Sequence, residues 1–114
     1  MSGITTHVLD TSVGRPAPGV PVRLDLHTDG KGWVTLAERV TDGDGRVTDL
    51  LAGGARLDAG RYRLTFATGV YFAERETPSF FPEASIVFEI RDPGQHYHVP
   101  LLLSPFGYST YRGS

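Results

Sequence analysis

The chain has 114 residues, of which 39% are hydrophobic and 21% are charged. This length and balance predict one compact domain with a buried core, and they exclude both an intrinsically disordered chain and a membrane-spanning segment. Lys and Arg number 11 against 13 Asp and Glu, which gives a formal net charge of -2. Because no basic stripe is present, nucleic acid and membranes are not expected partners, whereas a small-molecule or protein ligand is.

Cysteine is absent from the chain. Disulfides, thiolate nucleophiles and thiolate metal sites are therefore excluded. Residues 1–7 do not contain a basic segment followed by an apolar one, the pattern that opens a secretory signal. We therefore expect a cytoplasmic location.

The first half of the chain consists of short β-prone runs separated by turns. In the clearest run, Val20, Val22 and Leu24 occupy every second position with polar residues on the other face. This alternation predicts a strand that is buried on one side. Turns rich in Gly, Pro and Asp bound the runs, so strands are predicted at residues 4–9, 20–26, 33–40 and 46–50.

The second half continues the same rhythm, with one helix predicted at residues 68–76. Further strands are predicted at residues 62–66, 86–90, 97–103 and 107–112. The fold class expected is all-β, an eight-stranded two-sheet sandwich with one short helix, and residues 1–114 form a single domain. The run 99–103 is hydrophobic on both faces, which predicts contact with another subunit.

The histidines are the main candidates for chemistry. His7 lies on the strand face opposite Ile4 and Val8, where a surface or interface histidine is the simpler interpretation. His96 and His98 are two apart in one strand, so both imidazoles lie on one face. Such a pair can bind zinc, but no third residue has ligand spacing, so no metal site is predicted.

A metal-free hydrolytic site is the other interpretation. One imidazole would act as general base on water, and a guanidinium would stabilise the oxyanion or orient an anionic substrate. His7, His98 and Arg46 have the side chains for these roles. Composition alone does not distinguish this site from a set of structural polar residues.

Several motifs together resemble the transthyretin-related family over nearly the whole chain. They are residues 6–11 followed by 14–22, residues 44–47, the segment 80–83, and residues 97–105 running to Tyr111-Arg112-Gly113-Ser114. The chain is most similar to the family's 5-hydroxyisourate hydrolases. The closing Tyr-Arg-Gly-Ser is the hallmark of these hydrolases, and the hormone-carrying transthyretins lack it.

The resemblance implies a homotetramer of eight-stranded sandwiches, with active sites in a channel where two dimers meet. It also implies hydrolysis of the cyclic amide of 5-hydroxyisourate to 2-oxo-4-hydroxy-4-carboxy-5-ureidoimidazoline in urate degradation, with no metal or organic cofactor. His7 and His98 would activate water, and Arg46 would stabilise charge on the attacked carbonyl or hold the anionic purine.

Three residues of the closing motif would shape the substrate pocket, namely Tyr111, Arg112 and Ser114. The resemblance gives no role to His27 or His96. A transthyretin-like carrier without catalysis is the main alternative, but a carrier channel needs an apolar lining, whereas His7, Arg46 and His98 are polar and basic. A purely structural sandwich subunit is the second alternative.

Overall fold

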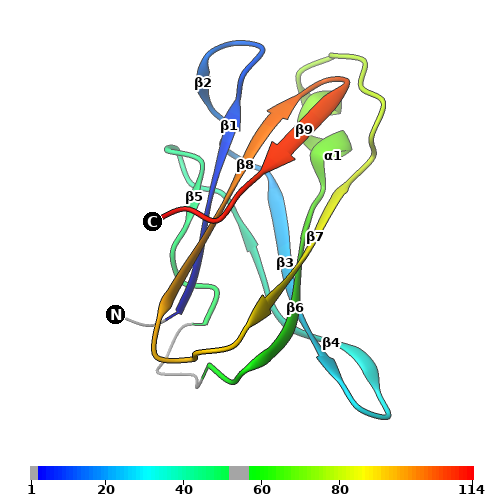
Figure 1. The fold of residues 1–114 in the computed structure, drawn as a ribbon. Helices are drawn as coiled ribbons and strands as arrows, with labels where there is room; N and C mark the ends of the chain where they lie inside the picture. Colours follow the sequence, from blue (N-terminus) through cyan, green and yellow to red (C-terminus); the bar gives the residue numbers. More distant parts are fainter. Residues whose placement is uncertain (1–2, 52–56) are drawn as a thin grey trace.

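Two β-sheets face each other in the computed structural model, which describes residues 3–51 and 57–114 (Figure 1). The first sheet contains β1 (Gly3–Asp10), β2 (Arg15–Pro16), β5 (Arg46–Val47), β8 (His96–Ser104) and β9 (Gly107–Thr110). Its order is β2-β1-β8-β9, and β5 pairs with β1. The second sheet has the order β4-β3-β6-β7, with β3 (Pro21–Thr28), β4 (Gly32–Val40), β6 (Gly60–Phe66) and β7 (Ala84–Ile90). The helix α1 (Thr68–Glu74) follows β6.

The predicted all-β sandwich with one short helix is confirmed. Each of the eight predicted strands is present, although β5 is shorter than the expected 46–50 and β9 is shorter than the expected 107–112. A ninth strand among the described residues, β2, lies in a segment predicted as a turn, where the chain folds back so that Asp10 pairs with Arg15. Two residues are too few to leave an alternating pattern, which is why the sequence does not reveal this strand.

The core lies between the sheets and is formed by the alternating positions of the strands. Leu24 and Leu64 from the second sheet are fully buried, as are Val8 and Leu101 from the first. Burial of such side chains contributes about 1.5 to 3 kcal/mol each and is the main force holding the two sheets together. No helix in the described ranges is long and apolar enough to cross a membrane.

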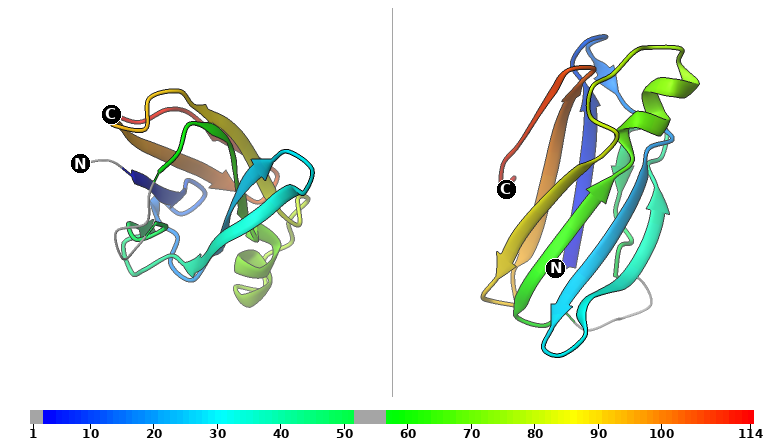
Figure 2. Two further views of the ribbon diagram at one scale, coloured as in Figure 1. Left: turned by 90° about the horizontal axis from the view of Figure 1, so that it is seen from below. Right: turned by 90° about the vertical axis from the view of Figure 1, so that its right-hand side faces the viewer.

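Strands from the beginning and from near the end of the chain pair in the first sheet. They are β1 and β8, which are parallel and run side by side (Figure 2). The register aligns Gly3 with His96 at one end and Asp10 with Leu103 at the other. Residues some 90 positions apart in sequence therefore become neighbours. This register brings together the polar side chains described below.

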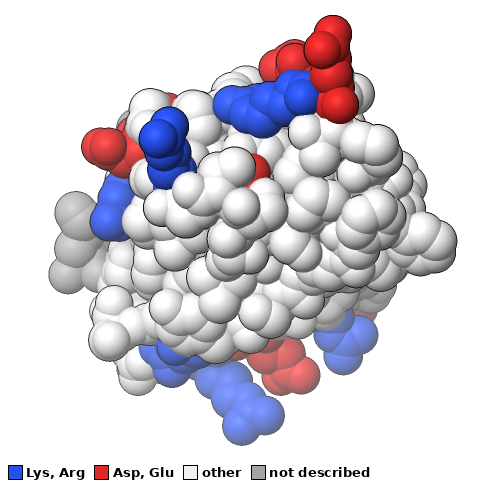
Figure 3. Space-filling view, turned by 90° about the horizontal axis from the view of Figure 1, so that it is seen from above, with Lys and Arg blue, Asp and Glu red and all other residues white. Residues whose placement is uncertain are grey.

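Figure 3 shows one end of the sandwich from above. Its charged side chains lie mainly along the margin, and a broad area without charged side chains lies between them. The β8–β9 turn and the loop before β7 lie at this end of the ribbon (Figure 1). The backbone N–H of Phe80 donates to the carbonyl of Pro105 at 2.9 Å, which joins the two segments. Phe80 and Phe106 are each 71% exposed, so this end carries apolar side chains that the single chain does not cover.

Candidate functional site

The outer face of the first sheet carries a row of half-buried polar side chains. Along β1, Ile4, Thr6 and Val8 point into the core, so Thr5 and His7 point outward. Along β8, Tyr97 and Val99 are buried, so His96 and His98 point outward. The predicted placement of His7 opposite the core face, and of His96 and His98 on one shared face, is confirmed. Because β1 and β8 are paired neighbours, the four side chains form one cluster.

Arg46 joins this cluster from the other side of β1. The strand β5 pairs with β1 so that Arg46 lies directly opposite His7. The turn before β5 is organised by Asp42, whose Oδ1 accepts hydrogen bonds from the backbone N–H groups of Asp44 and Arg46, both at 2.9 Å. The hydrogen bond from Arg46 lowers the pKa of Asp42 below its ordinary value. Asp42 and Asp44 thus lie in the turn expected between the predicted strands 33–40 and 46–50, and this turn positions Arg46.

His98 is held from two sides. Its Nδ1 lies 2.8 Å from Thr5 Oγ1, and the same hydroxyl lies 2.9 Å from Nε2 of His96. On the other side, the tail forms a bridge with β8, in which the N–H of Gly113 donates to the carbonyl of His98 at 2.8 Å. The imidazole therefore lies between the Thr5 hydroxyl and the backbone of the closing motif.

Electrostatics favour the neutral form of His98. Burial lowers the pKa of its imidazole below the ordinary value. The nearby guanidinium of Arg46 lowers this pKa further, as do the imidazoles of His7 and His96, while a hydrogen bond with Thr5 opposes the shift. A neutral imidazole near pH 7 can accept a proton, so His98 has the protonation state of a general base.

Two ring nitrogens of the cluster are buried without a hydrogen-bond partner among the described residues. They are Nε2 of His7 and Nδ1 of His96. Buried polar atoms in folded proteins are nearly always paired, so an unpaired one needs an explanation. The His7 nitrogen belongs to the residue that is paired with Arg46, so its unused hydrogen-bonding capacity lies in the part of the cluster nearest that guanidinium's strand.

The structure does not bring the predicted substrate-binding side chains into this cluster within one chain. Tyr111 and Arg112 instead line a groove of about 260 Å³ together with Ile86, Phe88, Glu89, Tyr97, Val99 and Thr110. The Arg112 guanidinium lies 4.5 Å from the ring centre of Tyr97 and donates to Gln95 at 2.8 Å. Ser114 is exposed. Of the closing motif, Gly113 contacts the histidine cluster through His98, and the Arg112 guanidinium reaches the backbone carbonyl of His96 at 3.4 Å.

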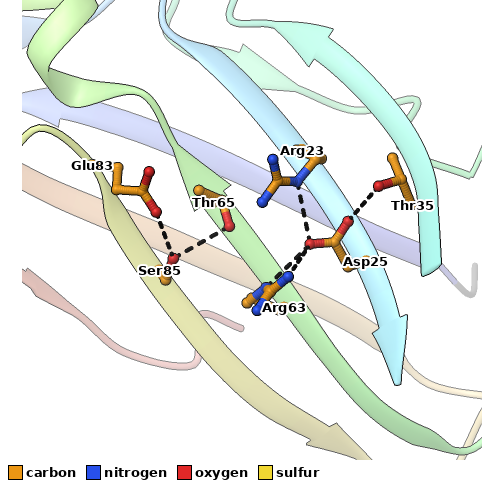
Figure 4. A network of polar contacts seen from close by, with 7 residues as sticks. All are labelled: Arg23, Asp25, Thr35, Arg63, Thr65, Glu83 and Ser85. Atoms are coloured by element: carbon orange, nitrogen blue, oxygen red, sulfur yellow. Dashed lines mark hydrogen bonds and ion pairs between the residues drawn. The ribbon is translucent and has the colours of Figure 1, made fainter. Parts of the chain in front are cut away.

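A second polar cluster lies on the other sheet and has a structural character (Figure 4). The buried carboxylate of Asp25 accepts hydrogen bonds from Arg23, Arg63 and Thr35. Burial raises the pKa of Asp25, but these hydrogen bonds outweigh it and hold the pKa below its ordinary value. Because the carboxylate is fully paired, this cluster offers no free group for chemistry. His27 lies near it and packs edge-on against Trp33.

In the part of the chain that the structure describes, no three His, Asp or Glu side chains gather closely enough to hold a metal ion. Nε2 of His96 and Nδ1 of His98 instead share the hydroxyl of Thr5. The sequence interpretation missed Thr5, because a threonine in a β-prone run carries no signal of its own and the β1–β8 register is needed to find it.

The known proteins that are similar to this chain include 5-hydroxyisourate hydrolases and transthyretins. A family model described as the HIUase/Transthyretin family matches residues 4–113. A 5-hydroxyisourate hydrolase of Caulobacter vibrioides is 48% identical, with 100% of both chains covered. The structure of Klebsiella pneumoniae 5-hydroxyisourate hydrolase is similar, with a TM-score of 0.85, 46% identity and coverage of 100% of this chain and 94% of that one. Sea bream transthyretin in complex with thyroxine has a TM-score of 0.90 at 33% identity, covering 96% of this chain and 93% of that one.

Proposed function

This chain belongs to the HIUase/Transthyretin family, and from this membership we propose that it hydrolyses 5-hydroxyisourate to 2-oxo-4-hydroxy-4-carboxy-5-ureidoimidazoline. Similarity to 5-hydroxyisourate hydrolases at 46 to 48% identity over the full chain supports this activity. The observation that carries the proposal is the convergence of His7, Arg46 and His98 on one outer sheet face. The domain that performs the reaction is the whole of residues 1–114.

The three basic side chains supply the elements of a hydrolytic mechanism. A neutral imidazole of His98 or His7 takes a proton from water as the water oxygen bonds to the carbonyl carbon of the cyclic amide. Arg46 stabilises the negative charge that develops on the carbonyl oxygen. The carbon–nitrogen bond of the ring then breaks, and the leaving nitrogen receives the proton from the imidazolium. No metal or organic cofactor enters these steps.

The active unit in this proposal is a homotetramer whose sites lie between subunits. The groove that Tyr111 and Arg112 line contains no side chain of the histidine cluster. In this proposal, the other residues that enclose the substrate beside the histidines therefore come from a neighbouring subunit. The exposed Phe80 and Phe106 support association, because monomeric proteins rarely leave large apolar side chains clustered in water. Light scattering on purified protein tests this. Four times the chain mass of 12.4 kDa is expected, and a monomer would contradict it.

The activity test uses substrate made in place from urate and urate oxidase. The expected result is a faster ultraviolet decay of 5-hydroxyisourate than in a protein-free control, with an optically active product detected by circular dichroism. The control is essential because this substrate also opens without a catalyst. Decay at the control rate would contradict the proposal.

A carrier without catalysis is the alternative function. The similarity to a transthyretin in complex with thyroxine supports it, but identity to that protein is 33% against 48% to the Caulobacter hydrolase. Equilibrium binding of thyroxine, measured beside the activity assay, separates the two functions. Binding without turnover would favour the carrier. A cytoplasmic location is a further part of the proposal, which cell fractionation tests.

A further inference from the structure

The Thr5 hydroxyl joins two histidines that approach it from the neighbouring strand. Thr5 lies opposite His98 in the parallel β1–β8 register, and His96 lies two positions earlier on the same face of β8. The distances from Thr5 Oγ1 are 2.8 Å to His98 Nδ1 and 2.9 Å to His96 Nε2. Both are hydrogen-bond lengths, so the three side chains form a continuous chain.

A hydroxyl group has one proton and two lone pairs, so the two imidazoles cannot both accept from Thr5. When the hydroxyl proton stays within the chain, two arrangements remain. In the first, His98 Nδ1–H donates to Thr5, and Thr5 donates to Nε2 of His96. In the second, His96 Nε2–H donates to Thr5, and Thr5 donates to Nδ1 of His98. In these two arrangements the proton positions of the imidazoles are coupled, because one imidazole donates to Thr5 and the other accepts from it.

Only the first arrangement suits a general base. With its proton on Nδ1, neutral His98 has an unprotonated Nε2 that can accept a proton from water, and the resulting imidazolium keeps its hydrogen bond to Thr5. In the second arrangement Nε2 already carries the proton. The remaining lone pair, on Nδ1, is then occupied by the Thr5 hydroxyl, so His98 cannot take up a proton without breaking the chain.

We propose that Thr5 and His96 are positioning residues that hold His98 in the tautomer with a free Nε2, through the chain His98 Nδ1–H to Thr5 Oγ1–H to His96 Nε2. The chain serves the same purpose as a carboxylate that orients a catalytic histidine, but it is uncharged. This inference rests on the proposed hydrolase function for its kinetic consequences, while the tautomer itself is independent of any substrate.

An uncharged orienting chain matches the charges around His98. The ionisable side chains that act on His98 are Arg46 from β5, His7 from β1 and His96 from β8, and all three disfavour its protonation. A carboxylate in place of Thr5 would favour the imidazolium and work against the neutral base that hydrolysis needs. Thr5 orients the ring without adding a negative charge.

Nitrogen NMR on the full chain tests the tautomer directly. In the wild type, at a pH where His98 is neutral, we expect a protonated Nδ1 and an unprotonated Nε2. Thr5→Val removes the hydroxyl while keeping a β-branched side chain, and it should shift His98 toward the tautomer protonated at Nε2. Thr5→Ser keeps the hydroxyl and should restore the wild-type spectrum. Thr65→Val, the same change on β6 of the other sheet, is the matched control and should leave the spectrum unchanged.

Kinetics give the second measurement. Thr5→Val should lower kcat by about 10-fold, because a general base contributes roughly 10²- to 10⁴-fold and misorientation removes part of this. KM should change less than twofold, and Thr5→Ser should recover most of the rate. His96→Phe removes the acceptor of the Thr5 hydroxyl and should act in the same direction, which provides a test if Thr5→Val does not fold.

A wild-type His98 protonated at Nε2 would overturn the proposal, as would a Thr5→Val protein with unchanged tautomer and unchanged kcat. If the wild type fails to accelerate hydrolysis, the proposed function fails. The NMR measurement still decides the tautomer in that case, so the two failures are distinguishable.

Discussion

The backbone of Gly113 packs against the imidazole of His98 so closely that no side chain fits between them. A Cβ atom placed on Gly113 would lie 2.6 Å from Cδ2 of His98 and 3.3 Å from its Cγ. The glycine is needed for this contact and not for an unusual backbone angle, since its φ lies outside the left-handed region. The closing motif thus supports the ring of His98 on the side away from Thr5.

Gly113→Ala should displace the His98 ring and lower kcat by about 10- to 100-fold, because a shift of about 1 Å at a catalytic group costs rate on this scale. The fold should survive, since the bridge from Gly113 lies at the end of the sheet. Gly107→Ala is the matched control, because its Cβ would make only an ordinary contact, 3.7 Å from Ser104 Oγ. Equal activities of the two variants would refute the supporting role of Gly113.

The faces of single strands were predictable from the sequence, but the pairing of distant strands was not. Alternation placed His7 outward on β1 and His96 beside His98 on β8, because side-chain direction has a period of two. The partnership of Thr5 with His98 depends on a register between segments about 90 residues apart, which no local pattern encodes. Likewise, the resemblance marked the closing Tyr-Arg-Gly-Ser, but only the contact distance explains its glycine.

Substitution of the basic residues tests their proposed roles. His98→Asn and Arg46→Lys should each lower kcat by about one to two powers of ten, through loss of a general base or of a planar charge-stabilising donor. Lysine keeps the charge of Arg46, but its donors lie on one nitrogen and do not form a planar fork. A reduced rate would therefore show that the geometry of the guanidinium matters. Near-wild-type rates in both variants would exclude the assignment. Circular dichroism should show an unchanged fold.

The turn before β5 offers an indirect test of Arg46. Asp42→Ala removes the acceptor for the N–H groups of Asp44 and Arg46, so the turn should loosen. KM should then rise, or kcat fall, by about tenfold or less. Asp42→Asn keeps an acceptor oxygen and should retain more activity. If Asp42→Ala were more active than Asp42→Asn, this result would contradict the proposal that Asp42 positions Arg46.

The pKa of His98 should respond to Arg46. Burial and the neighbouring guanidinium hold this pKa below the ordinary 6.5, so a rate that requires neutral His98 should be maintained below pH 6.5 and fall only at more acidic pH. Arg46→Gln removes a positive charge that disfavours the imidazolium, so the pKa of His98 should rise. NMR titration measures this even in an inactive variant. Arg91→Gln, at a side chain that is 89% exposed, is the control, and an unchanged pKa in Arg46→Gln would contradict the expected coupling.

The stability of the sandwich should depend on a buried contact between α1 and β1. The hydroxyl of Tyr71 donates to Oδ2 of Asp10 at 2.8 Å, and both residues are 2% exposed. Tyr71→Phe should therefore lower the free energy of unfolding by about 1.5 to 3 kcal/mol, the range for hydrogen bonds to charged groups. Tyr62→Phe is the matched control. Its hydroxyl donates at 2.7 Å to the uncharged carbonyl of Asp58 and accepts at 3.2 Å from the N–H of the same residue. Because both partners are uncharged, each bond should contribute only about 1 kcal/mol or less.

The same tyrosine predicts a dependence of stability on alkaline pH. Burial, together with the hydrogen bond to Asp10 and the negative charge of Asp10, raises the pKa of Tyr71 from 10.0 to about 12. The folded state therefore keeps a proton that the unfolded state loses, so the stabilisation is complete below pH 10 and disappears as the pH rises through about 12. Urea unfolding between pH 8 and pH 11 should show a steeper loss of stability for the wild type than for Tyr71→Phe. Parallel curves for the two proteins would mean that the pKa of Tyr71 is not raised in the folded state.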